Sequence, residues 1–197
     1  MGIDDINKYR IILASKSPRR RELLKELGIK FVQAANDRPE DFPSHLKGKD
    51  IALYLAGEKA NDFRDKVKDG EIVITADTIV WCNGHVLDKP AGKEDAHKIL
   101  GEISGNTHEV ITAVCLLSRN RQRTFYSSTK VTFTRLTDDE IEFYIDNFKP
   151  YDKAGGYGIQ EWIGLAACSF MEGSYFNVMG LPVEQLYHEL QKFIHDS

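Results

Sequence analysis

The segment EIVITADTIVWC, residues 71–82, is the most strand-like stretch of the chain. β-Branched side chains fill it and favour extended backbone, so we expect one strand over the whole segment. Asn83-Gly84, which follows directly, is typical of a two-residue hairpin turn and predicts a return strand over 85–88. A single carboxylate, Asp77, interrupts the otherwise apolar strand. The segment therefore predicts a sheet with an antiparallel component and one acidic group inside it.

Further strands and helices alternate on both sides of this segment. Strands are expected over 10–14, 30–35, 107–118, 123–135 and around 164–172. Helices are expected from Ser17-Pro18 to Gly28, over 50–66 and 93–103, from Thr137 to the residue before Pro150, and after Pro182. Thr137 and Glu140 have the spacing of a capping box, which marks a helix start. Alternating elements around long central hairpins predict the α/β class with a mixed sheet.

The composition of the 197 residues is that of an ordinary globular protein, and we expect one domain over residues 1–197. A net charge of −4 argues against a protein that coats nucleic acid through broad electrostatic attraction. The N-terminus lacks the apolar core of a secretory leader, and no apolar run is long enough to cross a membrane. We therefore expect a cytoplasmic protein with neither nucleic acid nor a membrane as partner.

Cysteine and histidine do not have the spacings of metal ligands. Cys82, Cys115 and Cys168 lie far apart, and no CxxC pair occurs, so we expect reduced, buried thiols. The six histidines show no H-x-H or H-E-x-x-H spacing, and we interpret them as surface or packing residues.

Residues 14–20, ASKSPRR, lie between an expected strand and an expected helix. A helix start offers unpaired backbone N–H groups and the positive end of the helix dipole, and both attract phosphate. The hydroxyls of Ser15 and Ser17 and the guanidinium groups of Arg19 and Arg20 add donors that suit phosphate oxygens. The segment predicts an anion site, with an ordinary N-cap followed by solvated arginines as the alternative.

Asp77 is the first candidate for chemistry, because Asp is a poor strand former and a buried, unpaired carboxylate is unfavourable. We interpret it as a metal ligand or a general base; a structural Asp satisfied by nearby backbone groups is the alternative. Lys89 follows the hairpin, and we expect it toward the Asp77 end of the strand pair. A cation opposite that carboxylate fits a triphosphate site.

Residues 152–160, DKAGGYGIQ, have three glycines in four positions, which lets backbone approach a ligand closely. The amide of Gln160 offers both a donor and an acceptor to a base edge, whereas a flexible linker is the alternative. Neither a P-loop nor a G-x-G-x-x-G after the first strand occurs. Glu40 lies in an acidic loop over 36–43, and Lys59 follows Glu58 on an expected helix, where the two side chains point in different directions.

In order and spacing these motifs resemble those of the Maf family of nucleotide pyrophosphatases, over nearly the whole chain. The resemblance is carried by ASKSPRR at 14–20, GEKA at 57–60, ADTIV at 76–80, LDKP at 87–90, ISG at 103–105, ITAV at 111–114, YDKAGGYGIQ at 151–160 and GSYFNVMGLP at 173–182. It implies the α/β Maf fold, related to that of inosine triphosphate pyrophosphatases, with a mixed central sheet flanked by helices and a central cleft. It also implies a homodimer and a divalent cation, Mg²⁺ or Mn²⁺, as cofactor.

The resemblance further implies a role for each matching position, with the metal ligands left open. Asp77 takes the place of the catalytic carboxylate, and the substrate-binding positions around the phosphates are Ser15, Arg20, Glu40, Lys59 and Lys89. Arg19, Thr78 and Gln160 match the positions that set base choice in the dTTP/UTP branch, and a sister branch that prefers 7-methyl-GTP differs there. Pro39-Glu40 stands where relatives often have two glutamates.

The expected reaction is hydrolysis of dTTP and UTP to the nucleoside monophosphate and pyrophosphate, which would also suit removal of non-standard nucleotides. Two other hypotheses stay open. One is a pyrophosphatase for CTP or for modified nucleotides such as 7-methyl-GTP. The other is a nucleotide-binding regulator of septum formation and cell division, a role that is also associated with Maf proteins.

Overall fold

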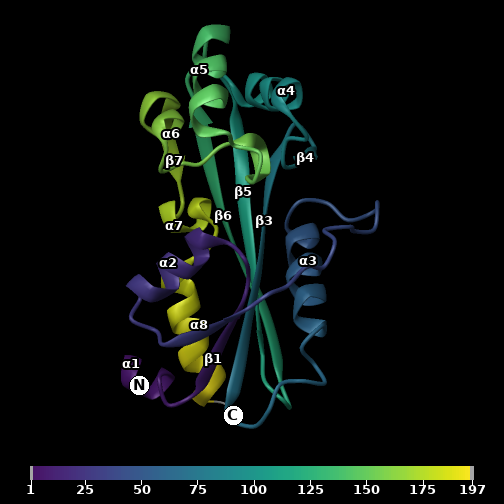
Figure 1. The fold of residues 1–197 in the computed structure, drawn as a ribbon, viewed down its shortest axis with the longest axis vertical. Coiled ribbons are helices and arrows are strands. Elements are labelled where there is room, and N and C mark those ends of the chain that lie inside the picture. The colour runs from purple at the N-terminus through teal and green to yellow at the C-terminus, as the bar shows by residue number, and fades with distance from the viewer. Residues whose placement is uncertain (1, 196–197) are drawn as a thin grey trace.

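Strand β3 (Glu71–Cys82) runs along much of the length of the molecule in the computed structural model, which describes residues 2–195 (Figure 1). The other strands are β1 (Arg10–Ala14), β2 (Phe31–Ala34), β4 (His85–Leu87), β5 (Thr107–Leu117), β6 (Gln122–Phe133) and β7 (Cys168–Glu172). They form one sheet in the order β2-β1-β3-β5-β6-β7, with β4 paired to β3. Strand β1 pairs in parallel with β2 and β3, and the other pairs are antiparallel. The predicted mixed α/β sheet is confirmed.

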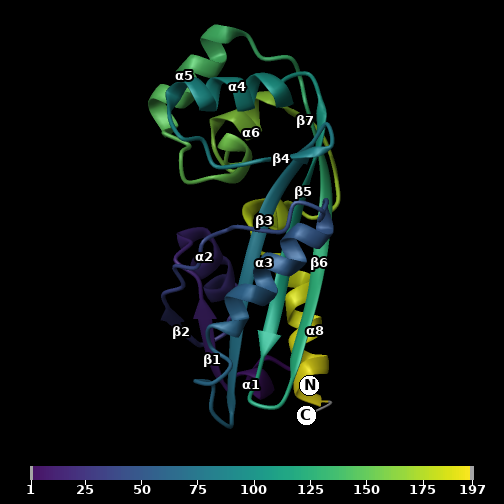
Figure 2. The ribbon, with the colours of Figure 1, turned by 90° about the vertical axis from the view of Figure 1, so that its right-hand side faces the viewer.

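Helices cover both faces of this sheet and gather at one end of it. They are α1 (Ile3–Ile6), α2 (Pro18–Glu26), α3 (Lys49–Asn61), α4 (Lys93–Ile103), α5 (Asp138–Phe148), the 3₁₀ turn η1 (Ala154–Gly156), α6 (Trp162–Ala167), α7 (Tyr175–Met179) and α8 (Val183–His195). Helix α3 packs on one face of the sheet, and α2 and α8 pack on the other (Figure 1). Helices α4, α5 and α6 and the turn η1 form a separate group at the upper end, here called the small lobe (Figure 2). The remainder, around β1, α2, α3 and α8, is called the large lobe.

One edge of β3 is left unpaired over a few residues, and this gap positions the site. Strand β1 pairs with 71–74 of β3, and β4 pairs with 80–82, whereas β5 pairs with 73–81 along the opposite edge. Residues 75–79 therefore have no neighbouring strand on the β1 side among the described residues. Because side chains alternate along a strand, Asp77 points to the face covered by α3, and Thr78 points to the face covered by α2 and α8.

Most expected elements are confirmed, and several have local causes that the structure shows. Asn83 and Gly84 both have positive φ, 48° and 85°, as a type I′ hairpin turn requires. The capping box is present: the hydroxyl of Thr137 accepts from the N–H of Glu140 at 3.3 Å, and the Glu140 carboxylate accepts from the N–H of Thr137 at 2.8 Å.

Two expected boundaries are wrong. The helix expected over 50–66 ends at Asn61. The strand expected around 164–172 is strand only over 168–172, because residues 162–167 form α6 and bury Ile163 and Ala167, four positions apart, on one helical face. The three cysteines are free as expected, but Cys168 is only half-buried. Among residues 2–195, none of the helices has the length and apolarity needed to span a bilayer.

Candidate functional site

A cleft of about 360 Å³ lies beside the unpaired edge of β3, with walls from both lobes. All nine residues that the sequence nominated line it: Ser15, Arg19, Arg20, Glu40, Lys59, Asp77, Thr78, Lys89 and Gln160. These residues are spread over nearly 150 positions of the chain, so only the fold brings them together. The expected central cleft is therefore confirmed.

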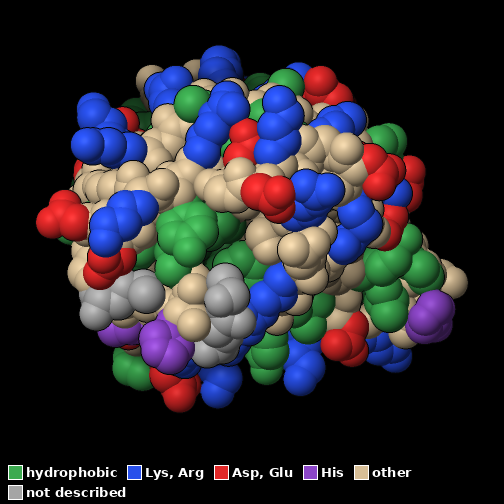
Figure 3. Space-filling view, turned by 90° about the horizontal axis from the view of Figure 1, so that it is seen from below, with side chains coloured by type: hydrophobic (Ala, Val, Ile, Leu, Met, Phe, Trp, Pro, Cys, Tyr) green, Lys and Arg blue, Asp and Glu red, His purple; other side chains and the backbone are tan. Residues whose placement is uncertain are grey.

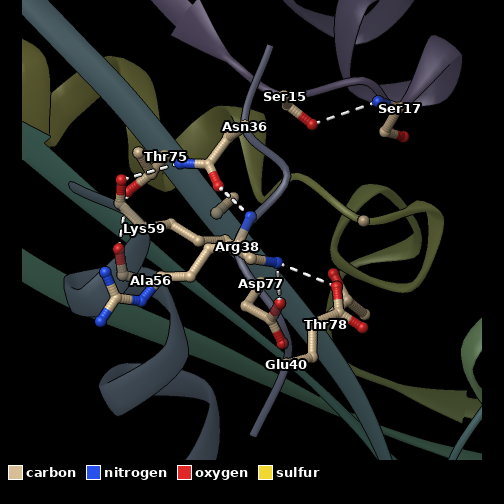
Figure 4. Close-up of polar contacts among 12 residues, drawn as sticks. Ser15, Ser17, Asn36, Arg38, Glu40, Ala56, Lys59, Thr75, Asp77 and Thr78 are labelled. Carbon is tan, nitrogen blue, oxygen red and sulfur yellow. Dashed lines mark hydrogen bonds and ion pairs between the residues drawn. The ribbon is translucent and has the colours of Figure 1, made fainter. Parts of the chain in front are cut away.

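Asp77 and Lys59 form an ion pair at the floor of the cleft. The Asp77 side chain is only 5 % exposed and that of Lys59 only 10 %, and Figure 4 shows Lys59 reaching from α3 to the carboxylate. The hydroxyl of Thr75 donates to the carbonyl of Ala56 at 2.7 Å and so fixes α3 against β3 at this level. Burial raises the pKa of the Asp77 carboxyl, and the nearby charges of Lys59 and Arg20 oppose that rise. Glu58, the neighbour of Lys59, points elsewhere, as expected.

Glu40 bridges two lysines at the side of the cleft. Its carboxylate lies 3.0 Å from Nζ of Lys59 and 2.6 Å from Nζ of Lys89, so Lys89 reaches the Asp77 end through Glu40 and not directly. Burial raises the pKa of Glu40, but hydrogen bonds and charges from Lys89 and Lys59 outweigh it and lower the pKa to about 2. The carboxylates of Asp77 and Glu40 therefore both contact the ammonium group of Lys59.

Two residues that the sequence did not nominate hold the loop of Glu40 against α3. The amide of Asn36 donates to the carbonyl of Lys59 at 2.9 Å. The guanidinium of Arg38 donates to Asp62 at 2.7 Å and also pairs with Glu58. Arg38 is the only cation in the acidic loop over 36–43. That was the one feature of the sequence that could have indicated its ion pairs.

The start of α2 lies in the wall of the cleft as predicted. Ser17 caps the helix by accepting from the N–H of Arg20 at 3.4 Å, and Pro18 has no N–H to offer. The hydroxyl of Ser15 accepts from the N–H of Ser17 at 3.2 Å and from Nη1 of Arg20 at 3.5 Å. With two donors directed at its oxygen, the remaining capacity of Ser15 is to donate its proton into the cleft.

The guanidinium of Arg20 is engaged by the protein itself. Nε donates to the carbonyl of Gly180 at 2.8 Å, Nη1 to the carbonyl of Ala76 at 2.9 Å, and Nη2 to the hydroxyl of Thr78 at 2.9 Å. The last two acceptors belong to the residues on either side of Asp77. The alternative of a solvated arginine is therefore wrong for Arg20.

The far side of the cleft belongs to the glycine-rich segment. Nη1 of Arg19 lies 3.2 Å from the carboxylate of Asp152, and Nζ of the buried Lys153 lies 2.8 Å from Asp152 and 3.2 Å from Glu161. Gly155 has φ +67°, and a Cβ there would meet Val80 at 2.8 Å, so the segment packs closely and is not a flexible linker. Gln160 lies exposed in the cleft wall. Asp152 and Lys153 belong to the segment 152–160, but nothing in their spacing indicates these contacts.

The donor set for a metal is small. Residues 2–195 contain no group of three or more His, Cys, Asp or Glu side chains placed to hold a metal ion. Asp77 and Glu40 both line the cleft, and each contacts the ammonium of Lys59. Mg²⁺ is commonly held by one or two carboxylates together with substrate phosphates, so this pair fits a cation that arrives with a nucleotide.

Comparison with known proteins adds the family. A family model described as "Maf-like protein" matches residues 10–193. The chain is 52% identical to a dTTP/UTP pyrophosphatase of Phocaeicola vulgatus, over 96% of this chain and 99% of that protein. It is 49% identical to a dTTP/UTP pyrophosphatase of Porphyromonas gingivalis, over 97% of this chain and 98% of that protein. Among solved structures, the Ham1 protein of Staphylococcus aureus is similar with a TM-score of 0.42 and 12% identity, over 63% of this chain and 71% of that one.

Proposed function

The chain belongs to the Maf family, and from that membership we propose that it is a nucleoside triphosphate pyrophosphatase that hydrolyses dTTP and UTP to the nucleoside monophosphate and pyrophosphate. The names of its curated relatives support these two substrates. The observation that carries the chemistry is the buried Asp77–Lys59 pair, set in a cleft with Lys89 and the Ser15 hydroxyl. This arrangement combines a carboxylate that can accept a proton with cations that can hold phosphate.

The phosphates would lie on the Asp77 side of the strand edge. Lys59 and Lys89 supply two ammonium groups; in the free protein Glu40 contacts both, and Asp77 also pairs with Lys59. Ser15 adds a hydroxyl whose available capacity is to donate, which suits a phosphate oxygen. A triphosphate that binds here would replace the carboxylate contacts of these lysines with phosphate contacts, so the exchange would have little net cost in free energy.

In the reaction, Asp77 accepts a proton from a water molecule as the water oxygen attacks the α-phosphorus. A new P–O bond forms to that oxygen, and the bond from the α-phosphorus to the α,β-bridging oxygen breaks. Pyrophosphate leaves with the bridging oxygen. Lys59 and Lys89 offset the negative charge that grows on this leaving group. A bound Mg²⁺ or Mn²⁺ would supply further neutralisation of the phosphate charge, and Asp77 and Glu40 are the residues that would hold it.

The base would lie on the other side of the strand edge, toward Arg19, Thr78 and Gln160. We assign Arg20 a positioning role, which differs from the phosphate contact that the resemblance implies. Its three hydrogen bonds to Gly180, Ala76 and Thr78 support this assignment. The single-domain organisation, the cytoplasmic location and the homodimer stay predictions.

The test is a turnover panel with added Mg²⁺ or Mn²⁺, in which pyrophosphate and orthophosphate are assayed separately. Pyrophosphate from dTTP and UTP, lost on chelation of the metal, is the expected result. Turnover confined to CTP or 7-methyl-GTP would keep the chemistry and overturn the substrates. No turnover of any nucleotide, with tight nucleotide binding, would favour the regulator of cell division.

A further inference from the structure

A chain of hydrogen bonds behind the cleft has a fixed direction. Nη2 of Arg20 lies 2.9 Å from Oγ1 of Thr78, which lies 2.9 Å from Oγ1 of Thr112, which lies 3.0 Å from the backbone carbonyl of Asn177. A guanidinium only donates and a carbonyl only accepts, so the two ends of the chain determine where each hydroxyl proton points.

The protons can be placed one by one. Two oxygens 3.0 Å apart need a proton between them, and the carbonyl of Asn177 has none, so Thr112 donates its single proton there. In its contact with Thr78, Thr112 therefore accepts, and Thr78 donates. Thr78 also accepts from Arg20. The Thr78 hydroxyl therefore has one lone pair left to accept a hydrogen bond from the cleft, and it has no proton left to donate there.

The surroundings hold this direction in place. Thr112 and Asn177 are fully buried, and the Asn177 amide is fixed by donating to the carbonyl of Val110 and to the hydroxyl of Thr129, each at 2.9 Å. The backbone carbonyl of Asn177 also accepts from the N–H of Gly180 at 3.0 Å. Burial leaves no room for a water molecule to reverse the chain, whereas Thr78 is half-buried and lines the cleft.

We propose that Thr112, through this chain, keeps Thr78 an acceptor-only group toward the bound base and thereby selects pyrimidines that carry a proton on N3. Uracil and thymine have an N3–H to donate, whereas N3 of cytosine is itself an acceptor and would face a lone pair. The inference rests on the proposed function and names the origin of its base choice. Thr112 is a positioning residue, because it does not touch the substrate.

The test replaces Thr112 with valine, which keeps the shape and removes the acceptor for the Thr78 proton. The Thr78 hydroxyl can then turn its proton toward the cleft and donate to N3 of cytosine. We expect the ratio of kcat/KM for UTP to kcat/KM for CTP to fall roughly tenfold, mainly through a gain with CTP, as one misdirected hydrogen bond suggests. Turnover of UTP should stay within about threefold of wild type, on the same one-bond reasoning. The Thr112→Ser enzyme keeps the hydroxyl and should keep the wild-type ratio.

Folding is expected to survive, because the Asn177 carbonyl retains its bond from Gly180. If the valine enzyme does not fold, Thr112→Ala removes the same acceptor and answers the same question. A folded variant with the wild-type UTP:CTP ratio would overturn the role of Thr112. Absence of UTP and dTTP turnover in the wild-type enzyme would instead contradict the proposed function itself, so the two failures are distinct.

Discussion

Asp77 and Lys59 are a buried ion pair, and stability alone does not explain such a pair. Removing two charges from water is unfavourable, and apolar side chains of similar volume often stabilise a protein as well or better. The pair lies in a cleft lined by further cations. In the proposed reaction the ammonium would contact a phosphate and the carboxylate would accept a proton. We therefore infer that the pair is retained for the proposed chemistry and not for stability.

We predict that Asp77→Asn lowers kcat for dTTP and UTP by roughly 10²–10⁴-fold, the usual contribution of a positioned general base. The amide keeps the size of the side chain, and Lys59 retains Glu40 as its partner, so the fold should persist. Circular dichroism would confirm folding, and steady-state kinetics would give the loss. Asp146→Asn is the matched control, since that exposed carboxylate lies on α5, pairs with Lys93 and is not among the residues that line the cleft, so kcat should stay nearly unchanged. Near-normal turnover in folded Asp77→Asn would contradict the assignment.

The pH profile gives a second prediction at this scale. Burial raises the pKa of Asp77, so turnover should fall on the acid side at a pH above the ordinary aspartate value, as the base becomes protonated. Glu40, with a pKa of about 2, stays ionised there and does not cause the fall. Lys59→Met removes an opposite charge that favours ionised Asp77, and the acid limb of kcat/KM should move up by about one pH unit or more.

Measuring kcat/KM from pH 4 to 9 in the wild-type and Lys59→Met enzymes tests the predicted shift. The variant needs only enough residual activity to locate the acid limb of its profile. A shift to lower pH in Lys59→Met, or no shift, would contradict Asp77 as the titrating base. Lys89→Met is the comparison variant, because Lys89 contacts Glu40 and not Asp77, and its limb should move less.

At the residue scale the sequence indicated the residues that line the cleft but not the directions of their hydrogen bonds. Asp77 was predictable because a carboxylate in an apolar strand needs a partner. That Ser15 can only donate and Thr78 can only accept depends on Arg20, Ser17, Thr112 and Asn177 meeting in space. No spacing in the sequence encodes those contacts.

At the scale of elements, the unpaired edge of β3 arises from the lengths of its neighbours. The strand bounds 71–82 and the hairpin were predicted from β-branched residues and Asn83-Gly84, because both are local signals. The gap at 75–79 depends on β1 ending opposite Ile74, which parallel pairing decides and no local pattern reveals. The unpaired edge at 75–79, which positions the cleft, could therefore not be predicted from local sequence patterns.

Helix α6 contains the glycine with the closest backbone approach, and it carries the third prediction. A Cβ on Gly164 would lie 1.8 Å from the carbonyl oxygen of Ile159, whose neighbour is Gln160. Gly164→Ala should lower the free energy of unfolding by about 3 kcal/mol or more and raise KM for UTP, because the chain before α6 must move. Gly101→Ala, in α4 with open space around it, should instead stabilise by about 0.5–1 kcal/mol. Urea unfolding of the two variants checks both signs, and equal effects would contradict the argument.

At the scale of the whole molecule, ion pairs cross the cleft from one lobe to the other. Arg19 of the large lobe meets Asp152 beside the small lobe, and Glu40 meets Lys89 on the other side. These contacts join residues 133 and 49 positions apart, so the sequence could nominate Arg19 and Lys89 without naming their partners. Figure 2 shows how the two lobes lie along the same sheet.

The end of the molecule opposite the small lobe carries charges of both signs. Figure 3 shows Lys and Arg side chains among Asp and Glu side chains on this face. Arg119 pairs with Asp69, and Arg123 pairs with Glu189. Pairing of this kind reduces the positive potential that would attract a polyanion to a surface, so the cleft remains the stronger candidate for phosphate binding.

The two edge strands of the sheet differ in the apolar surface that they offer to a second copy of the chain. Strands β7 and β2 are the two ends of the sheet, and an exposed edge strand is a template for pairing with another chain. Phe170 on β7 is 60% exposed and Leu165 on the adjoining helix α6 is 86% exposed, whereas β2 exposes Val32 at 43%. We expect a homodimer in light scattering, with twice the mass of one chain, which Phe170→Lys converts to monomer while Val32→Lys does not. Dissociation by Val32→Lys alone would move the interface to β2, and a monomeric wild-type protein would contradict the dimer.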